Sequence, residues 1–584
     1  MSDHSDHARK ETVMRSSEWF AGDDEVAVAH RVALRSSGLE ISANDTRPII
    51  GIADSSSDLN PCNLPLRELA DDVAAGVVAA GGIPVKFSVM SMGEDLMKPS
   101  AMLYRNLLSM EVEEYLRSYP IDGVVLLANC DKSVPGALMG AVSSDLPTLV
   151  FTAGARPIAK FKGRRIGAGT DLWRAWEQHR TGEMSDSDWD EFERCLNCGL
   201  GACNTMGTAS SMAIVTETLG MCLPGSATIP AGDADRVRAA IATGERIVEM
   251  TLNDVRPSQI LTNTAFANAV RMLSAVGGST NVVLHLLAIA GRSAGSLTLD
   301  DVGEIAATVP VLADVEPSGS LLIQDFHASG GVRAMVRELG ELFDASAVTA
   351  SGRTWRDEAA EAAPRGIAIR PLDNPLHANG AFAVVRGSLA PRGALIKTSA
   401  ASAELLTHSG PALVFQSYND MRSRIDDPDL AVSSNTVLVL VGAGPVAVPG
   451  MPEWGMIPIP AKLAAAGVHD MVRITDSRMS GTSFGTCVLH VAPEAAVGGP
   501  LALVRDGDII SLDAANGTLD LEVDDAELDR RRAQWARPRS PHLRGWPALY
   551  QRHVTQADLG CDLDFLRPES DEARTFVPPV VGRS

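Results

Sequence analysis

In the first quarter of the chain, a cysteine, an aspartate and a lysine stand next to one another shortly after an apolar run. Val124–Leu127 is expected to be a buried strand, and directly after it come Asn129, Cys130, Asp131 and Lys132. In open α/β sheets, ligands bind at the carboxyl ends of the strands. A thiol suits soft metals and a carboxylate suits hard cations, while a lysine adds an amine. This stretch therefore predicts metal chemistry.

Two further candidate ligands also follow predicted strands. Arg47–Ala53 is expected to be the first buried strand, and the polar loop after it ends in Cys62. The next strand, Ile83–Val89, is followed by Glu94. Apolar residues at helical spacing come after each loop, so strands and helices alternate and the sheet is expected to be parallel. Cys62, Glu94 and Cys130 should then lie at one edge of the sheet.

The chain has eight cysteines, and two groupings of them suggest a metal site. Cys195, Cys198 and Cys203 lie in one loop, but no nearby CxxC or HxxxH pair supplies the fourth ligand of a zinc site. Cys62, Cys130 and Cys203 come from three Gly/Asn-rich loops and fall one thiolate short of the four that usually hold an iron–sulfur cluster. Such a cluster would keep an open iron position for a substrate oxygen. The alternative is that all three are buried structural thiols.

Cys203 also precedes a predicted helix. Gly199 and Gly201 allow a tight loop, and a helix is expected from Thr208 onward. Cys203 is therefore expected just before a helix N-terminus, where the dipole favours a thiolate.

Carboxylates elsewhere in the chain are candidates for a second metal. Glu94, Asp131 and Glu453 have the oxygen ligands that Mg²⁺ prefers, with water or substrate completing the coordination. A lone carboxylate in a loop is more often a helix cap or a solvated charge, and Lys132 next to Asp131 could form a simple ion pair.

A serine in a later loop is the candidate nucleophile or base. Val472–Thr475 is expected to be a strand, and Asp476–Thr482 (DSRMSGT) follows it. Ser480 stands between small residues at that strand end, with Thr482 nearby. A serine hydroxyl is weak unless a neighbour activates it, and ordinary loop turns have the same composition.

The composition excludes several classes of protein. The 584 residues carry a net charge of −22 and are 45% hydrophobic. This acidic balance disfavours a nucleic-acid partner, since phosphate binding needs a basic face. No apolar run is long enough to span a membrane, and the polar N-terminus lacks the apolar core of a secretory signal. The expected location is the cytoplasm, with no membrane contact.

The length requires more than one domain. We expect a flexible tail over residues 1–20, an α/β domain over 21–350 that binds the metals, a linker over 351–375, and a β-rich, barrel-like domain over 376–584 that carries Ser480. The fold class is thus α/β, with a helix-covered, mostly parallel sheet followed by a β-rich domain. Predicted β segments of the second domain are Phe382–Arg386, Ala412–Phe415, Thr436–Val441, Val472–Thr475 and Leu501–Val504. Asp506-Gly507 and Asn516-Gly517 are predicted hairpin turns.

Six motifs in this order resemble the IlvD/Edd family of dihydroxyacid and sugar-acid dehydratases over nearly the whole chain. They are SDLNPCN (Ser57–Asn63), NCDKSVPG (Asn129–Gly136), GLGACNTMGTASSM (Gly199–Met212), GGSTN (Gly277–Asn281), ITDSRMSG (Ile474–Gly481) and HVAPEAAVGGPLALVRDGD (His490–Asp508). In addition, Met102–Leu127 and Ser16–Phe20 are more similar to the aldonate dehydratases, of the L-arabinonate and D-xylonate type, than to the branched-chain biosynthetic enzymes.

The resemblance implies roles for the candidate residues. Cys62, Cys130 and Cys203 would hold the cluster, which a cysteine in the first loop marks as [2Fe-2S]. Glu94, Asp131 and Glu453 would bind Mg²⁺, together with Lys132 if that lysine is carbamylated as in the relatives. Ser480 would be the base, with Thr482 beside it, while Cys195 and Cys198 would not be ligands, and Cys198 would mark a packing position.

The implied reaction is a dehydration of a 2,3-dihydroxy acid to a 2-keto-3-deoxy acid by a hydro-lyase. A sugar acid such as L-arabinonate or D-xylonate is the first expectation for the small-molecule partner. The alternatives are a dihydroxy-acid dehydratase of branched-chain amino-acid biosynthesis, or an enzyme that covers both. From a different class, a cluster-bearing sensor would need neither Ser480 nor the Mg²⁺ carboxylates. The resemblance also implies a homodimer or homotetramer.

Overall fold

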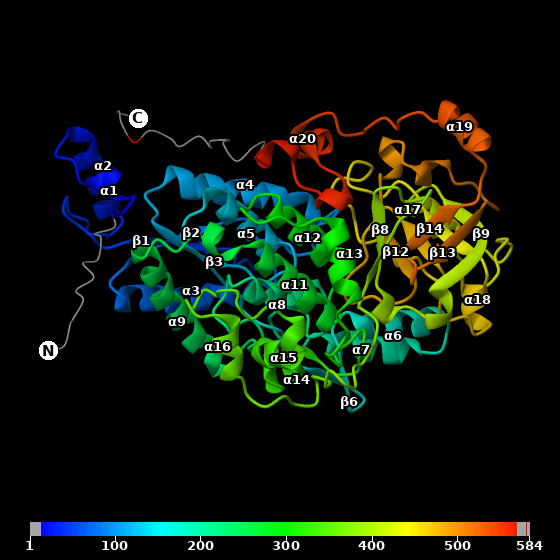
Figure 1. Cartoon of the computed structure of the whole chain (residues 1–584), viewed down its shortest axis with the longest axis horizontal. Helices are drawn as coiled ribbons and strands as arrows, with labels where there is room; N and C mark the ends of the chain where they lie inside the picture. The colour runs from blue at the N-terminus through cyan, green and yellow to red at the C-terminus, as the bar shows by residue number, and fades with distance from the viewer. Residues whose placement is uncertain (1–12, 569–579, 581–584) are drawn as a thin grey trace.

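The computed structural model describes residues 13–568 and 580, which form two halves lying side by side (Figure 1). The N-terminal half contains a parallel sheet covered by helices, and the C-terminal half is built on a larger sheet. The expected fold class, an α/β domain followed by a β-rich one, is therefore confirmed.

The sheet of the N-terminal half has four parallel strands in the order β2-β1-β3-β4. These are β1 (Ile49–Asp54), β2 (Ile83–Ser88), β3 (Gly123–Leu127) and β4 (Thr148–Phe151). Strands β1 and β3 consist mostly of β-branched and leucine side chains and are almost wholly buried, which is typical of a parallel sheet covered on both faces. Each strand runs in the same direction, so the loops after β1, β2 and β3 meet at one edge.

Helices cover both faces of this sheet. Helices α4 (Met102–Ser118) and α5 (Ser133–Ser144) pack together on one face, and α3 (Leu66–Ala79) and α9 (Ala234–Leu252) on the other (Figure 1). Both pairs approach closely at a glycine: a Cβ on Gly140 would lie 2.3 Å from the Ser109 carbonyl oxygen. Small residues in these helices thus set the thickness of the layers.

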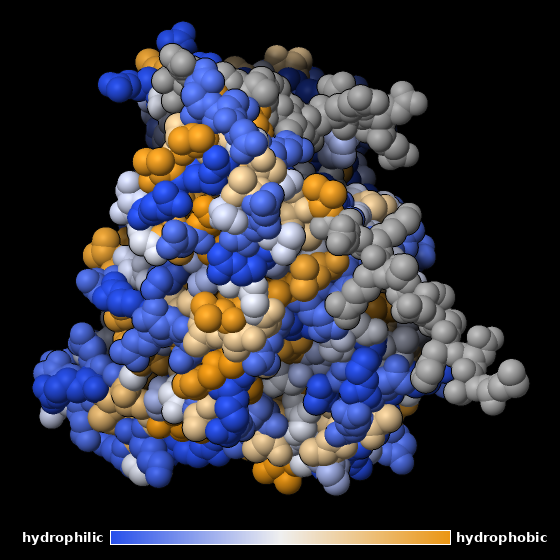
Figure 2. Space-filling view, turned by 90° about the vertical axis from the view of Figure 1, so that its left-hand side faces the viewer, coloured by the Kyte–Doolittle hydropathy of each residue, from blue (hydrophilic) through white to orange (hydrophobic). Residues whose placement is uncertain are grey.

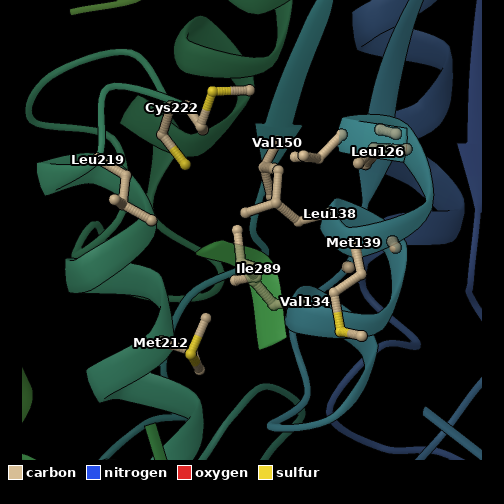
Figure 3. Close-up of a cluster of buried hydrophobic side chains, with 14 of the residues drawn as sticks. Leu126, Val134, Leu138, Met139, Val150, Met212, Leu219, Cys222 and Ile289 are labelled. Atoms are coloured by element: carbon tan, nitrogen blue, oxygen red, sulfur yellow. The ribbon is translucent and has the colours of Figure 1, made fainter. Parts of the chain in front are cut away.

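A mostly helical region completes the core of the N-terminal half. Figure 3 shows side chains of β3, β4 and α5 packed against α8 (Thr208–Thr218) and α12 (Asn281–Ala290). The remaining helices of this region are α10 (Pro257–Ile260), α11 (Asn263–Ala275), α13 (Leu299–Ala307), α14 (Ile323–Ala328) and α15 (Gly331–Leu339). Helices α8 and α12 are buried along every face, so they act as core elements rather than as an outer layer.

The C-terminal half is organised around eight strands in the order β14-β13-β9-β10-β11-β12-β8-β7. They are β7 (Ala383–Val385), β8 (Gly393–Ile396), β9 (Thr407–Phe415), β10 (Val437–Leu440), β11 (Arg473–Thr475), β12 (Cys487–Ala492), β13 (Ile509–Asp513) and β14 (Thr518–Leu521). The four central strands are parallel and the outer ones antiparallel. A bridge between Arg386 and Thr518 joins the two ends, so the sheet is nearly closed into a barrel.

Two local predictions in this half are wrong. Leu501–Val504 is not a strand: Pro500–Leu503 forms a 3₁₀ helix with proline in its first turn and Leu501 and Leu503 buried. An apolar pair at short spacing does not distinguish this helix from a strand, but the preceding proline favours the helix. Asp506-Gly507 makes a turn before β13 without joining two paired strands, whereas Asn516-Gly517 does join β13 to β14 as predicted.

The described part of the expected N-terminal tail is packed rather than free. Ser17–Phe20 forms α1, Phe20 is buried, and Ser16 donates two hydrogen bonds to the Asp122 carboxylate, each 2.8 Å long. Helix α2 (Glu25–Ser36) follows. The tail looked mobile because its few apolar residues lack a period, yet Asp122 and the buried Ile41, Ile49 and Ile83 give it a docking site. Residues 1–12 of the predicted tail lie outside the described residues.

The expected linker also contains packed structure. Helix α16 (Trp355–Ala360) lies within it, and Trp355 is fully buried with its indole N–H donating to the Thr218 carbonyl oxygen at 3.1 Å. Ala368 and Ile369 belong to the same core. The polar, glycine- and proline-containing composition indicated a change of domain but not that this segment belongs to the N-terminal core.

The last described segment crosses back from the C-terminal half to the N-terminal half. Helices α19 (Asp525–Gln534) and α20 (Gly545–His553) lead to residues 554–567, which contact α4 and α12 (Figure 1). Arg105 of α4 donates to the carbonyl oxygens of Gly560 and Cys561, and Arg292 forms a two-pronged ion pair with Asp562. This C-terminal segment therefore fastens the two halves together.

The surface at the α1–α2 end is mixed in character. Figure 2 shows hydrophobic residues interspersed with hydrophilic ones on this face. Such scattering is normal for a protein surface in water. Among the described residues, no helix combines the length and the apolar character needed to cross a bilayer.

The Arg292–Asp562 pair yields a stability prediction. Both side chains are fully buried, so Asp562→Asn would leave a guanidinium inside the protein without its main counter-charge. We expect the free energy of unfolding to fall by about 3 kcal/mol, the lower end of the usual range, because Glu113 at 3.8 Å still balances part of the charge. Unfolding in denaturant measures this change in the free energy of unfolding. Asp529→Asn, which breaks an exposed Arg–Asp pair, is the control and should change the value by less than about 0.5 kcal/mol.

The same pair predicts a pH dependence. Burial alone would raise the pKa of Asp562, but Arg292 outweighs it and the pKa lies below its ordinary value. The stabilisation is therefore fully present above the unfolded-state pKa of about 3.9 and is lost as the pH falls through the lower folded-state pKa. The wild type and Asp562→Asn should converge in stability in acid, and an unchanged difference at low pH would contradict this assignment.

Candidate active site

One pocket at the junction of the two halves gathers the residues singled out in the sequence. Its volume is about 810 Å³. The predicted residues that line it are Cys62, Glu94, Cys130, Asp131, Cys203, Glu453, Ser480 and Thr482. Lys132 lies behind this wall and is completely buried. The expectation that Cys62, Glu94 and Cys130 meet at one edge of the parallel sheet is confirmed.

Two buried asparagines hold the thiol-bearing loops together. The Asn63 side-chain oxygen accepts from the backbone N–H groups of Asn129 and Cys130, at 3.1 and 2.8 Å. The Asn129 side chain donates to the carbonyl oxygens of Cys62 and Gly154 and accepts from two N–H groups after β4. These asparagines adjoin Cys62 and Cys130 in the sequence, so each thiol is fixed by the loop that carries the other.

Two of the three thiols, Cys62 and Cys203, lie near a buried guanidinium. Arg156, which the sequence analysis missed, has Nη2 3.8 Å from Cys62 Sγ. A hydrogen bond with Cys62 raises the pKa of Cys130, and burial raises it further. Burial also raises the pKa of Cys203 to about 12, although the Arg156 charge opposes this. Burial therefore outweighs the predicted effect of the helix dipole on Cys203: the dipole of α8 acts within its first turn, and Cys203 stands several residues before Thr208.

The other two cysteines of that loop lie elsewhere. Cys195 packs against an apolar cluster beside α7 (Asp186–Leu196), and neither it nor Cys198 is among the pocket-lining residues. Cys198 is exposed, so the packing position expected for it is wrong. Both observations agree with their exclusion from the ligand set.

A network of buried charges forms a second wall of the pocket, which adjoins the thiols at Asp131. The Lys132 amine pairs with the adjacent Asp131 and lies 3.5 Å from Glu453 Oε1 and 4.0 Å from Glu94 Oε2. Burial would lower the pKa of Lys132, but the three carboxylates raise it above its ordinary value. Glu94 also accepts from the Ser100 hydroxyl and the Ala101 N–H. The unmodified lysine thus occupies the place of a cation among hard oxygen ligands.

Arg478 and Asn281 complete this network and were not identified from the sequence. Arg478 Nη1 lies 2.7 Å from Glu453 Oε1, and its Nη2 lies 3.3 Å from Glu94 Oε1. The Asn281 amide nitrogen donates to the same Glu453 oxygen at 2.7 Å, while its Oδ1 has no hydrogen-bond partner. Both residues lie inside conspicuous motifs, DSRMSG and GGSTN, which was the available signal.

Ser480 lies on the loop between β11 and β12, held close to α8. A Cβ on Gly481 would lie 2.6 Å from the Thr208 N, so only glycine allows this approach. Ser480 Oγ is 3.0 Å from Thr482 Oγ1 and 3.4 Å from the Thr482 backbone N. Thr482 Oγ1 in turn accepts from the Trp173 indole N–H at 3.0 Å. Trp173 belongs to α6 (Thr170–Arg180) of the N-terminal half.

The outer part of the pocket is aromatic and cationic. The Tyr418 ring of α17 (Tyr418–Arg424) stacks on Trp454 at 4.5 Å, next to Glu453. Lys98 and Arg422 also line the pocket, and neither forms an ion pair with a carboxylate of the described chain. This end of the pocket therefore offers two cations that remain available to a ligand.

The donor chemistry of the two walls fits the expected cofactors. Three thiols that line one pocket suit an iron–sulfur cluster, since thiolates hold such clusters. Three carboxylates suit Mg²⁺. Within residues 13–568 and 580, no group of three or more His, Cys, Asp and Glu side chains is already arranged as a metal site. On the carboxylate wall, Lys132 and Arg478 supply the positive charge.

Comparison with known proteins identifies the relatives of this chain. Residues 47–358 match the dihydroxy-acid/6-phosphogluconate dehydratase N-terminal family, and residues 367–561 match the corresponding C-terminal family. A 6-deoxy-6-sulfo-D-gluconate dehydratase from Pseudomonas putida is 48% identical over 96% of this chain and 98% of its own length. An L-arabinonate dehydratase from Rhizobium leguminosarum bv. trifolii is 46% identical over 95% and 96% of the two chains. A dihydroxy-acid dehydratase from Methanobrevibacter smithii is 37% identical over 91% and 97%. The chain therefore belongs to the dihydroxy-acid/6-phosphogluconate dehydratase family.

Proposed function

We propose that the protein is a hydro-lyase that converts a 2,3-dihydroxy acid to a 2-keto-3-deoxy acid. The observation that carries this proposal is that Ser480 faces the same pocket as a thiol wall and a carboxylate wall. A cluster-bearing sensor, the alternative from another class, needs neither the serine nor the carboxylates. Membership of a dehydratase family also favours an enzyme over a sensor.

The two walls are proposed to hold different groups. Cys62, Cys130 and Cys203 would hold a [2Fe-2S] cluster, while Glu94, Asp131 and Glu453 would hold Mg²⁺, with Lys132 joining them if carbamylated. When bound, the two groups would supply Lewis acidity toward the 3-hydroxyl and toward the carboxylate and 2-hydroxyl, respectively. A carbamylated Lys132 would be anionic, which would explain why an amine stands among ligands for a cation.

The protein's own residues account for the proton transfers. Ser480 reacts in its alkoxide form, which the cations of the pocket stabilise. Its Oγ takes the proton from C2 of the substrate. The 3-hydroxyl leaves and takes up the proton that Ser480 accepted, which forms water and restores the alkoxide, so one molecule of water is lost and no electrons are gained or lost. The resulting enol tautomerises to the 2-keto acid. Thr482 lies beside Ser480 throughout and holds its oxygen in place.

A sugar acid is the first proposal for the substrate. The two relatives at 46–48% identity are named for sugar acids, and the one at 37% is named a dihydroxy-acid dehydratase. L-Arabinonate and D-xylonate come first, the branched-chain dihydroxy acids second, and activity on both remains a proposal. A cytoplasmic location is proposed because no apolar run is long enough to span a membrane. A homodimer or homotetramer is proposed on the family resemblance, and light scattering of the purified protein checks the oligomer.

The first prediction concerns the reaction and its base. Anaerobically purified protein should release 2-keto-3-deoxy acids from at least one member of a panel of L-arabinonate, D-xylonate, gluconate, 6-deoxy-6-sulfo-D-gluconate and dihydroxyisovalerate. Ser480→Ala should lower kcat by about 10²- to 10⁴-fold, the usual contribution of a general base, and keep the absorption spectrum of the wild type. Keto-acid detection by mass spectrometry measures the product. A protein that has the brown colour of a bound cluster but acts on no member of the panel would contradict the proposed enzyme. An active Ser480→Ala variant would show that Ser480 is not the base.

The second prediction concerns the thiol wall. Cys62→Ser and Cys130→Ser should each lose most of the bound iron and acid-labile sulfide, because a cluster held by three thiolates tolerates no further loss of ligands. Elemental analysis should give about two irons per wild-type chain for a [2Fe-2S] cluster. Cys198→Ser is the matched control, since Cys198 is exposed and is not among the residues that line the pocket, and it should keep the iron content. Equal iron in all three variants would refute the assigned ligands.

The third prediction discriminates between substrates. Arg422 lines the outer pocket without a carboxylate partner, so it should bind the far end of a substrate that ends in an anion. Arg422→Ala should lower kcat/KM for 6-deoxy-6-sulfo-D-gluconate by about 10- to 100-fold, the size expected for loss of a charged hydrogen bond, and leave L-arabinonate within about twofold. A uniform loss on both substrates would show that Arg422 shapes the pocket instead.

A further inference from the structure

A chain of two hydrogen bonds connects Ser480 to Trp173, a residue of the N-terminal half. Trp173 Nε1 donates to Thr482 Oγ1 at 3.0 Å, and Thr482 Oγ1 lies 3.0 Å from Ser480 Oγ. An indole N–H can only donate, so the first bond has a fixed direction. Nothing in the comparisons or in the motifs points to Trp173.

The direction of the second bond follows from the acceptors within reach. Thr482 has one hydroxyl hydrogen, and Ser480 Oγ is the one acceptor for it that the described chain provides. Once Ser480 acts as an alkoxide it has no hydrogen to give, and the direction from threonine to serine is then the only possible one. The Thr482 backbone N–H points at the same oxygen from 3.4 Å.

Ser480 Oγ therefore faces two donors from Thr482, one from the side chain and one from the backbone. Hydrogen bonds to the charged form of a group stabilise that form. Bonds within a chain polarise one another, so the indole N–H makes the threonine hydroxyl a better donor. This arrangement favours an alkoxide on Ser480, which is the form that a base needs.

Helix α6 is fastened in a way that keeps Trp173 in place. At its first turn, the Thr170 hydroxyl donates to the Thr482 carbonyl oxygen at 3.0 Å. At its last turn, Arg180 pairs with Asp426 at 2.7 Å and donates to the Ile459 carbonyl oxygen. One end of the helix is thus bonded to the Ser480 loop itself and the other end to Asp426 and Ile459 elsewhere in the C-terminal half.

We propose that Trp173 is a positioning residue that acts through Thr482 to hold the Ser480 oxygen as a hydrogen-bond acceptor and so stabilise its alkoxide. This inference rests on the proposed function, in which Ser480 is the base. It assigns Trp173 no contact with substrate and no proton transfer of its own. The role depends on the indole N–H and not on the aromatic ring.

Kinetics of Trp173→Phe test the role of the N–H group, because phenylalanine keeps an aromatic ring and lacks the donor. We expect kcat to fall by about 2- to 10-fold, the effect of one neutral hydrogen bond, with KM nearly unchanged. Thr482→Ser keeps the hydroxyl and should retain most activity, whereas Thr482→Val should lose more. Trp189→Phe, on α7 outside the pocket, is the matched control and should behave as the wild type.

A double-mutant cycle separates this role from a merely structural one. If Trp173 acts through Thr482, Trp173→Phe should cost nothing further in the Thr482→Val background. The same loss in both backgrounds would overturn the proposal, because it would show that the indole shapes the pocket independently. Wild-type kcat in Trp173→Phe would overturn it as well.

A chemical readout needs no turnover and so separates this inference from the proposed function. In Ser480→Cys, the introduced thiol should be alkylated by iodoacetamide faster than in the Ser480→Cys/Trp173→Phe double variant, since the same donors favour a thiolate. Peptide mass spectrometry follows that one thiol among the native cysteines. Equal alkylation rates would overturn the role of Trp173 even in an active enzyme. A rate difference in a protein inert on every substrate would support the hydrogen-bond chain and count against the proposed function alone.

Discussion

A few buried charges at the junction of the two halves constrain the rest of the structure. Arg478 comes from the C-terminal half, yet one of its nitrogens is bonded to Glu453 of the same half and the other lies 3.3 Å from Glu94 of the N-terminal half. Lys132 of the N-terminal half lies close to both carboxylates. A buried charge without its partner costs several kcal/mol. Neither half can satisfy these groups alone, so closure of the halves is part of forming the site.

Contacts away from the pocket maintain this closure. The Trp546 indole of α20 donates to the Leu103 carbonyl oxygen of α4, and the buried Arg292–Asp562 pair fastens the segment that follows. Arg180 of α6 makes a comparable connection at the pocket mouth. The C-terminal segment reaches from the C-terminal half to the N-terminal half, and α6 of the N-terminal half is bonded in the other direction across the junction. A shift between the halves would disturb both of them together with the charges of the pocket.

The sequence predicted the parts of the site that depend on local order. Cys62 and Cys130 could be placed together because apolar runs identify parallel strands and every parallel strand ends at the same edge. Arg478 and Trp173 could not be placed, since their partners are set by how the halves dock; Arg478 and Glu94 are 384 positions apart. The same limit applies to the predicted linker: its composition marked a domain boundary but could not show that Trp355 is buried in the N-terminal core.

Cys130 and Asp131 are neighbours in the chain, and this explains how thiol and carboxylate ligands can form two separate groups in one pocket. The Cys130 side chain meets Cys62, and the Asp131 side chain meets Lys132. Because the two residues are neighbours in the chain, the spacing between the thiol wall and the carboxylate wall is fixed by one peptide unit, with Cys130 Sγ 3.4 Å from Asp131 Oδ1. Asn63 then fixes that peptide unit by accepting from the Cys130 N–H. The spacing between the Cys130 thiol and the Asp131 carboxylate is therefore set inside the N-terminal half. The C-terminal half contributes Ser480, Glu453 and Arg478, so its docking completes the pocket that this spacing begins.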